Sequence, residues 1–193
     1  MNKVTRLFDV EMREAETDSN IVEGMAVVFD QEADMGWFTE KIDRHAFDNT
    51  DMSDVVLNFN HDNNYLLAGT RNGSLQLRVD DNGVFQRSNI VDTTQGRDVM
   101  KLIRSGLLSK QSFAFTIADG GERWETIDGK EYRTITNIDH LYDCSIVTFP
   151  AYSQTTLWSR GADELADQHK ALMEKRKEQD ERMEKLLNGN LVK

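Results

Sequence analysis

Cysteine, proline and histidine are all scarce in this chain. Its 193 residues include one cysteine, one proline and four histidines. A single cysteine, Cys144, permits neither an internal disulfide framework nor a zinc site built from cysteines. The absence of paired cysteines is typical of a protein from a reducing compartment.

Basic residues are outnumbered by acidic ones. The chain has 23 Lys and Arg against 34 Asp and Glu, and its formal net charge is −11. A nucleic-acid-binding protein needs a basic face to displace counterions from phosphates, and anionic membranes attract basic segments. The charge balance therefore argues against nucleic acid and against a membrane surface as partners.

Long apolar runs are also missing. No stretch approaches the length of a membrane span, and the first ten residues lack the apolar segment of a signal peptide. We expect a protein that is cytoplasmic in the cell that makes it. The sequence contains no phosphate-binding glycine loop and no cluster of metal ligands, so we expect neither a cofactor nor a metal.

The chain divides into two regions of different character. Residues 1–160 are numerous enough for one domain with a sizeable core. Residues 161–193 form a charged tail, in which the segment 162–187 has no Gly or Pro and holds eight acidic and six basic residues. We expect this tail to be a weakly amphipathic helix, or a coiled-coil arm, attached to the core as an appendage.

The core pattern predicts a mainly β (α+β) fold. The dipeptides Asn72-Gly73 and Asn82-Gly83 favour tight hairpin turns, so residues 65–91 are predicted to form a meander of three strands. Strands are predicted at 4–12, 21–29, 37–42, 55–60, 65–70, 74–79, 84–91, 112–118, 122–126, 131–138 and 143–149.

Two helices are predicted within the core. Asp43 is suited to cap a short helix over 44–49, because its carboxylate can accept the free amide hydrogens of a first turn. Apolar residues recur at helical spacing over 94–105, with a threonine pair at the start and Gly106 at the end.

The stretch 106–117 is the main candidate for chemistry. Phe113, Phe115 and Ile117 point to one face of the predicted strand, and Ser112 points to the other. Such a strand can be an ordinary edge strand that is wetted on one side. It can also bury its aromatic side chains in order to hold one hydroxyl at the floor of a cleft.

Two side chains are candidates for a nucleophile. Cys144 is intrinsically better as a thiolate, but it lies in an apolar strand, where a free cysteine is most often a small buried hydrophobe. Ser112 needs a base, and His61, at the end of an apolar strand, is placed to supply one. A cysteine hydrolase that pairs Cys144 with His140 is a rival interpretation.

A third group would orient the imidazole of His61 and stabilise its charged form. Asp143, Asp139 and His140 are available for this role, and Asp143 begins the last predicted strand. Asp62 is less suited, because neighbours on a chain rarely point at each other. The residue pattern leaves this choice open.

Several motifs follow one another between residues 21 and 158. They are 21–29, 36–42 followed by Ala46-Phe47, Phe59-Asn60-His61-Asp62, Leu67-Ala68-Gly69-Thr70, Gly96-Arg97-Asp98-Val99, 106–115 and 141–152. In this order they resemble the prohead (capsid-maturation) serine proteases of tailed phages, which share a fold with the herpesvirus assembly proteases. The family usually has glutamate where this chain has Asp143, Gly-Met where it has Lys110-Gln111, and glycine where it has Ala114.

The resemblance implies an antiparallel β-barrel-like core and a serine endopeptidase. It makes His61 the general base, Ser112 the nucleophile and Asp143 the third member of a triad. The implied substrates are the scaffold protein and the scaffolding segment of the major capsid protein, inside the immature capsid (prohead) in the host cytoplasm, and the chain would also cut itself. Fold relatives form dimers, which implies a homodimer. The alternative is a non-catalytic capsid-assembly or scaffolding protein that keeps the β domain as a binding module.

Overall fold

The structure, a computed structural model, describes residues 3–8, 13–14 and 19–148. The predicted helical tail at 161–193 and residues 9–12 of the first predicted strand lie outside this part of the chain. The bounds of the elements are β1 (Val4–Phe8), β2 (Arg13–Glu14), β3 (Ile21–Val28), β4 (Ala33–Asp34), β5 (Phe38–Ile42), β6 (Val56–Phe59), β7 (Asp62–Gly69), β8 (Leu75–Asp80), β9 (Gly83–Asn89), α1 (Thr94–Arg104), β10 (Lys110–Ile117), β11 (Glu122–Ile127), β12 (Lys130–Ile135) and β13 (Ile138–Val147).

A five-stranded sheet with the order β1-β10-β13-β6-β7 carries the residues that the sequence singled out. Strand β10 pairs antiparallel with β1 and with β13, whereas β13 and β6 run parallel. The rings of Phe113 and Phe115 stack with their centroids 5.1 Å apart, and both side chains are fully buried. The predicted aromatic face of this strand therefore does anchor it in the core.

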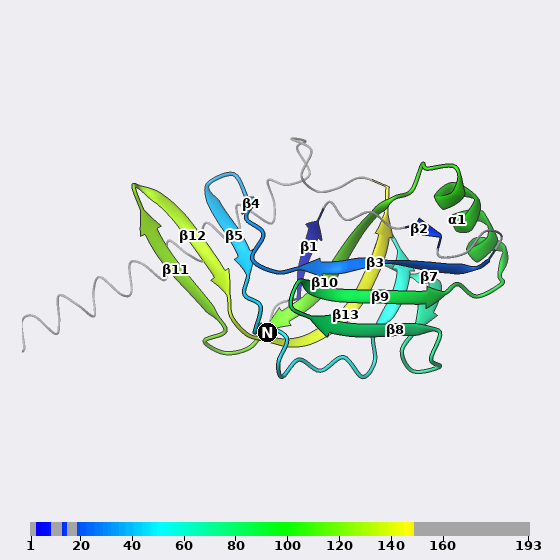
Figure 1. Ribbon diagram of the computed structural model, residues 1–193, viewed down its shortest axis with the longest axis horizontal. Coiled ribbons are helices and arrows are strands. Elements are labelled where there is room, and N and C mark those ends of the chain that lie inside the picture. Colours follow the sequence, from blue (N-terminus) through cyan, green and yellow to red (C-terminus); the bar gives the residue numbers. More distant parts are fainter. Residues whose placement is uncertain (1–2, 9–12, 15–18, 149–193) are drawn as a thin grey trace, which may run out of the picture. The chain divides into compact units, whose positions relative to one another are not determined.

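A second sheet, with the order β2-β3-β9-β8, crosses the first one (Figure 1). Val22, Val27 and Val84 from this sheet are fully buried in the same apolar core as the aromatic face of β10. The β8–β9 hairpin approaches β3 closely at Gly83, where an added Cβ would lie 2.0 Å from the carbonyl oxygen of Val27. Only glycine fits there.

The third sheet, β11-β12-β5-β4, includes the β11–β12 hairpin, which projects away from the other two sheets (Figure 1). Strands β12 and β5 run parallel, and their register places Arg133 beside Glu40. Both side chains are buried, so this sheet carries a pair of opposite charges into the interior.

The mainly β character is confirmed, but a closed barrel is not found among the described residues, which form three separate sheets. The expected antiparallel pairing holds for most strand pairs, but β13–β6 and β12–β5 are parallel. Alternation along a strand shows which faces are buried. It does not show which distant strand becomes the neighbour or in which direction that strand runs.

The predicted meander over 65–91 is only partly correct. Strands β8 and β9 form the expected hairpin, but β7 pairs with β6 in the five-stranded sheet. The turn at Asn72-Gly73, with a φ of 73° at the glycine, carries the chain from one sheet to another. An Asn-Gly pair reverses the chain locally, but long-range pairing decides whether the flanking strands bond to each other.

Of the two predicted helices, α1 is found and the short one over 44–49 is not. Thr93 caps α1, and its hydroxyl accepts a hydrogen bond from the amide of Gly96 at 3.0 Å. Residues 44–49 form successive turns instead. The amide of His45 does bond Asp43 at 2.9 Å, but the hydroxyl of Thr50 bonds the carbonyl of Ile138 at 2.8 Å and ties the segment to β13.

Candidate active site

Ser112 lies in the third position of β10 and is fully buried. Its strand is buried on both faces, so the interpretation as an edge strand that is wetted on one side does not apply around this residue. In the β-sheet register Ser112 lies opposite Leu7 of β1 on one side and Ser145 of β13 on the other. Pairing with a strand on each side therefore fixes the position of the hydroxyl.

His61 occupies the bend between β6 and β7. Asn60 and His61 have φ angles of 53° and 57°, in the left-handed region that residues with a Cβ adopt at some cost. Two hydrogen bonds hold the bend: Asn60 N donates to the carbonyl of Ile146, and His61 N donates to Ser145 Oγ, both at 2.9 Å. The sharp turn directs the imidazole back over the sheet, and 25% of this side chain is exposed.

Asp143 lies in the middle of β13, not at the start of a strand as the sequence pattern suggested. It pairs with Ala114 of β10, and its side chain is 2% exposed. A small residue at position 114 leaves the carboxylate room on the face that it shares with the hydroxyl of Ser112.

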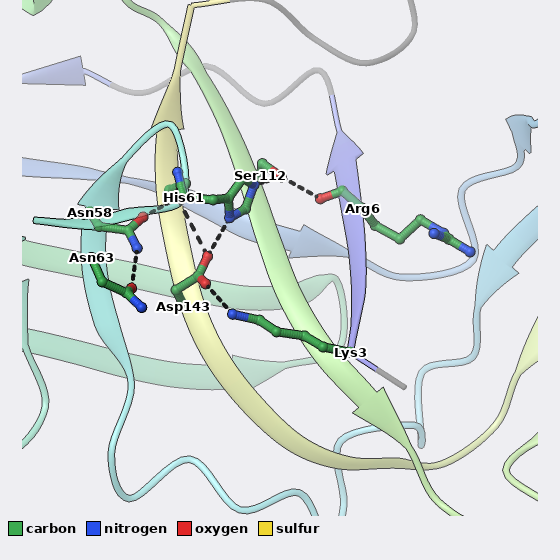
Figure 2. Close-up of polar contacts among 8 residues, drawn as sticks. Lys3, Arg6, Asn58, His61, Asn63, Ser112 and Asp143 are labelled. Atoms are coloured by element: carbon green, nitrogen blue, oxygen red, sulfur yellow. Dashed lines mark hydrogen bonds and ion pairs between the residues drawn. The ribbon is translucent and has the colours of Figure 1, made fainter. Parts of the chain in front are cut away.

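The three side chains form one chain of hydrogen bonds, which we call the candidate triad (Figure 2). His61 Nδ1 lies 2.6 Å from Asp143 Oδ1, and His61 Nε2 lies 2.6 Å from Ser112 Oγ. A proton on Nδ1 donates to the carboxylate, which leaves Nε2 of the neutral ring to accept the hydroxyl hydrogen. This arrangement places a base directly against a hydroxyl.

The other acidic and imidazole candidates have different partners. His140 Nδ1 pairs with Asp51 at 3.3 Å, and its ring lies 4.3 Å from that of Tyr142. The side chain of Asp139 is exposed, and Asp62 accepts hydrogen bonds from Asn64. The structure therefore places Asp143 against the imidazole of His61, whereas His140 and Asp62 interact with other residues.

Comparison with known proteins places the chain in a family. No curated protein matches the sequence. Residues 8–168 match the family model described as caudovirus prohead serine protease. The chain belongs to this family. The resemblance seen in the ordered motifs is thereby confirmed.

Among solved structures, the chain is similar to one described as the bacteriophage T4 capsid assembly protease, gp21. The sequence identity is 8%, and the match covers 75% of this chain and 97% of the other, with a TM-score of 0.46.

In this member of the prohead protease family, the carboxylate of Asp143 has two basic neighbours, His61 and Lys3. Burial alone would raise the pKa of Asp143, but hydrogen bonds and charge from His61, and then from Lys3, outweigh burial and lower that pKa. Lys3 Nζ lies 3.0 Å from Asp143 Oδ2, while Oδ1 faces the imidazole. The carboxylate therefore stays charged at neutral pH and faces a different partner with each oxygen.

The hydroxyl of Ser112 has a second acceptor besides the imidazole. The carbonyl oxygen of Arg6 in β1 lies 3.0 Å from Ser112 Oγ (Figure 2). A hydroxyl has a single hydrogen, so this carbonyl competes with His61 Nε2 for it.

Cys144 is unsuited to act as a nucleophile in this fold. Its side chain is fully buried, and it belongs to the apolar core on the face of β13 opposite Asp143. Burial, followed by the negative charge of Asp143, strongly raises the pKa of the Cys144 thiol. The thiolate is therefore suppressed, and the pairing of Cys144 with His140 has no structural support.

Sequence reasoning missed four polar contributors, namely Lys3, Arg6, Asn58 and Ser145. Lys3 and Arg6 precede the matched motifs, and Arg6 acts through its backbone carbonyl, which leaves no trace in a side-chain pattern. Ser145 offered a signal, because residues two apart on a strand share a face, and Asp143 lies two residues before it.

Two absences apply to the described part of the chain. No group of three or more His, Cys, Asp and Glu side chains there is arranged to hold a metal ion. No helix within residues 3–8, 13–14 and 19–148 is long and apolar enough to cross a bilayer.

Proposed function

We propose that this chain is a serine endopeptidase that cleaves capsid proteins during prohead maturation. The observation that carries the proposal is the continuous set of hydrogen bonds from Ser112 through His61 to Asp143. Family membership supports the same reaction class. The proposed substrates are the scaffold protein and the scaffolding segment of the major capsid protein, and self-cleavage is part of the proposal.

In the proposed mechanism, His61 Nε2 takes the proton of Ser112 as the hydroxyl oxygen attacks the scissile carbonyl. The imidazolium then returns that proton to the leaving amine, which yields an acyl-enzyme and a new amino terminus. Water repeats the cycle to release the acid. Asp143 holds the Nδ1–H tautomer and stabilises the imidazolium, because its carboxylate is 2.6 Å away and charged.

The setting follows from the family. A prohead protease works within the immature capsid, in the cytoplasm of the infected host. We therefore place the cleavage of capsid and scaffold proteins inside the prohead.

The decisive test compares Ser112→Ala with the unaltered chain on co-assembled capsid and scaffold proteins. New amino termini are identified by mass spectrometry. We expect them with the unaltered chain and not with Ser112→Ala, while the thermal unfolding temperature stays close because the substitution is small. Ser88→Ala is the matched control, because Ser88 is a fully buried strand hydroxyl in another sheet. Normal processing by Ser112→Ala would overturn the assignment.

One observation favours a second candidate, a non-catalytic capsid-assembly protein that keeps the protease domain as a binding module. Ser112 is fully buried, and the carbonyl of Arg6 competes for its hydrogen. A fluorophosphonate probe separates the two candidates, because only an activated serine reacts with it. Labelling that disappears in Ser112→Ala supports the endopeptidase, and an unlabelled chain that still supports capsid assembly supports the binding module.

A further inference from the structure

Ser145 lies beside the candidate triad, although it is neither the nucleophile, nor the base, nor the orienting carboxylate. Strand β13 places it two residues after Asp143 on the same face. The sheet register sets Ser145 opposite Ser112 of β10 on one side and opposite Asn58 of β6 on the other. The side chains of Ser145, Ser112 and Asn58 are all fully buried.

The hydroxyl of Ser145 uses both its acceptor and its donor capacity. It accepts the amide hydrogen of His61 at 2.9 Å and donates to Oδ1 of Asn58. Oδ1 of Asp143, the oxygen that faces the imidazole, lies 3.4 Å from the same hydroxyl. One side chain therefore contacts both the backbone of the base and the carboxylate that orients it.

These contacts matter because the backbone at His61 is strained. Two consecutive residues, Asn60 and His61, have positive φ angles, and such a conformation persists only where its surroundings enforce it. The His61–Ser145 bond and the Asn60–Ile146 bond both tie the bend to β13. The strand that carries Asp143 therefore also fixes the position of the His61 imidazole.

We propose that Ser145 is a positioning residue, which holds the His61 backbone and the Asp143 carboxylate in register with Ser112. The proposal rests on the endopeptidase function proposed above. A purely structural hydroxyl would contribute to stability only. A positioning residue also sets the geometry of proton transfer, in which a misplacement of about 1 Å costs on the order of 100-fold in rate.

The test uses Ser145→Ala in the full chain. We expect kcat for peptide cleavage, and the rate of fluorophosphonate labelling at Ser112, to fall by roughly 10-fold to 100-fold, with little change in KM. Ser145→Thr, which keeps the hydroxyl on a β-branched side chain suited to a strand, should restore much of the rate. Ser88→Ala again serves as the buried control and should lose stability but not rate.

A second readout does not depend on turnover. The low-field proton signal of the His61 Nδ1–H bonded to Asp143 should shift or broaden in Ser145→Ala and stay unchanged in Ser88→Ala. If the alanine variant fails to fold, Ser145→Cys replaces it, because a thiol keeps the volume but is only a weak donor and acceptor.

The outcomes separate the two proposals. Wild-type kcat and an unshifted signal in a folded Ser145→Ala or Ser145→Cys variant would overturn the positioning role, even with the endopeptidase established. A chain that neither cleaves nor labels, but whose His61 signal moves in Ser145→Ala, would overturn the endopeptidase and retain the positioning of His61 by Ser145.

Discussion

Two buried polar clusters, the candidate triad and an ion cluster, meet at β1. They differ in whether they contain a proton that can move. The candidate triad bonds the backbone carbonyl of Arg6, and the side chain of the same residue enters an ion cluster. The ion cluster consists of Arg6, Glu40, Arg133 and Glu122. Within it, two guanidinium groups flank one carboxylate, with Arg6 Nη2 at 2.8 Å and Arg133 Nη1 at 3.0 Å from Glu40 Oε2.

The difference lies in which protons can move. A guanidinium group stays protonated at any pH that a folded protein tolerates, so the ion cluster has fixed charges and one stable arrangement. The triad combines a neutral hydroxyl with an imidazole, whose ring nitrogens can both accept and release a proton. Both clusters are almost fully buried, apart from the imidazole of His61 and Glu122. Burial of polar groups therefore does not by itself indicate a catalytic site. The candidate triad differs from the ion cluster because it holds a transferable proton between a hydroxyl and an imidazole.

The largest effect is expected from a substitution in the candidate triad, at Asp143. Asp143→Asn should lower kcat by about 10⁴-fold, as the same exchange does in a well-studied triad, because the amide favours the wrong imidazole tautomer. Peptide cleavage by the full chain measures the effect. Asp139→Asn and His140→Ala are the matched controls and should retain activity. A larger loss in either control, with folding intact, would transfer the orienting role to that residue.

Glu40→Gln removes the central negative charge of the ion cluster. We expect the free energy of unfolding to fall by about 3–5 kcal/mol, because two buried guanidinium groups lose their shared anion. Denaturant unfolding measures the loss, and fluorophosphonate labelling per folded molecule should be unchanged. Glu125→Gln, which removes an exposed pair with Arg123, is the control and should stay within about 0.5 kcal/mol of the unaltered chain.

The same variant tests the acid response. Burial raises the pKa of Glu40, but Arg6 and Arg133 outweigh it and hold the pKa below its ordinary value. A lowered folded-state pKa stabilises the protein above the unfolded value of about 4.3 and loses that contribution as the pH falls through the folded value. The unaltered chain should therefore lose stability more steeply in acid than Glu40→Gln does. Equal slopes would show that Glu40 is not the charged group.

Lys3→Met should have the smallest effect. It removes the cation from Asp143 Oδ2, and the hydrogen bond and charge of Lys3 help to lower the pKa of Asp143. Without Lys3 this carboxyl should become protonated at a higher pH, so the loss of kcat/KM in acid should begin at a higher pH, by a small amount because 47% of Lys3 is exposed. A shift to lower pH would contradict the proposed link between Lys3 and the triad.

The sequence alone specified most of the local structure. Helical spacing and a threonine cap located α1, and alternation around Phe113 and Phe115 located β10. The residue types for acyl transfer, a hydroxyl with a histidine at a strand end, were also visible. Ordered motifs then assigned Ser112 and His61. The helix, the strand and the residue types depend on a few neighbouring residues, whereas the assignment of Ser112 and His61 depended on the resemblance to a family.

The tertiary structure decided the contacts between distant segments. The residue pattern left Asp143, Asp139 and His140 open as partners of His61, and only the resemblance selected Asp143, which follows His61 by 82 residues. A register shift between Ala114 and Phe115 changes the phase of β13, so that Asp143 pairs with Ala114 and His140 pairs with Thr116 on the same face of the sheet. Asp143 reaches the imidazole of His61, whereas His140 bonds Asp51. A bulge is a property of paired strands, and one strand's sequence does not show it.

Gln111 shows a further case in which the sequence pattern predicts burial but not the contacts of the buried side chain. The resemblance marked it as a departure from a usual methionine, and the structure shows a fully buried amide whose nitrogen and oxygen have no hydrogen-bond partner among the described residues. The alternation that buries Phe113 also buries Gln111. The sequence by itself determined most of the strands, helix α1 and the reacting residue types, because these follow from neighbours along the chain. Tertiary structure alone decided strand partners, register and the bonds of Ser145, because each requires segments that meet only when the chain folds.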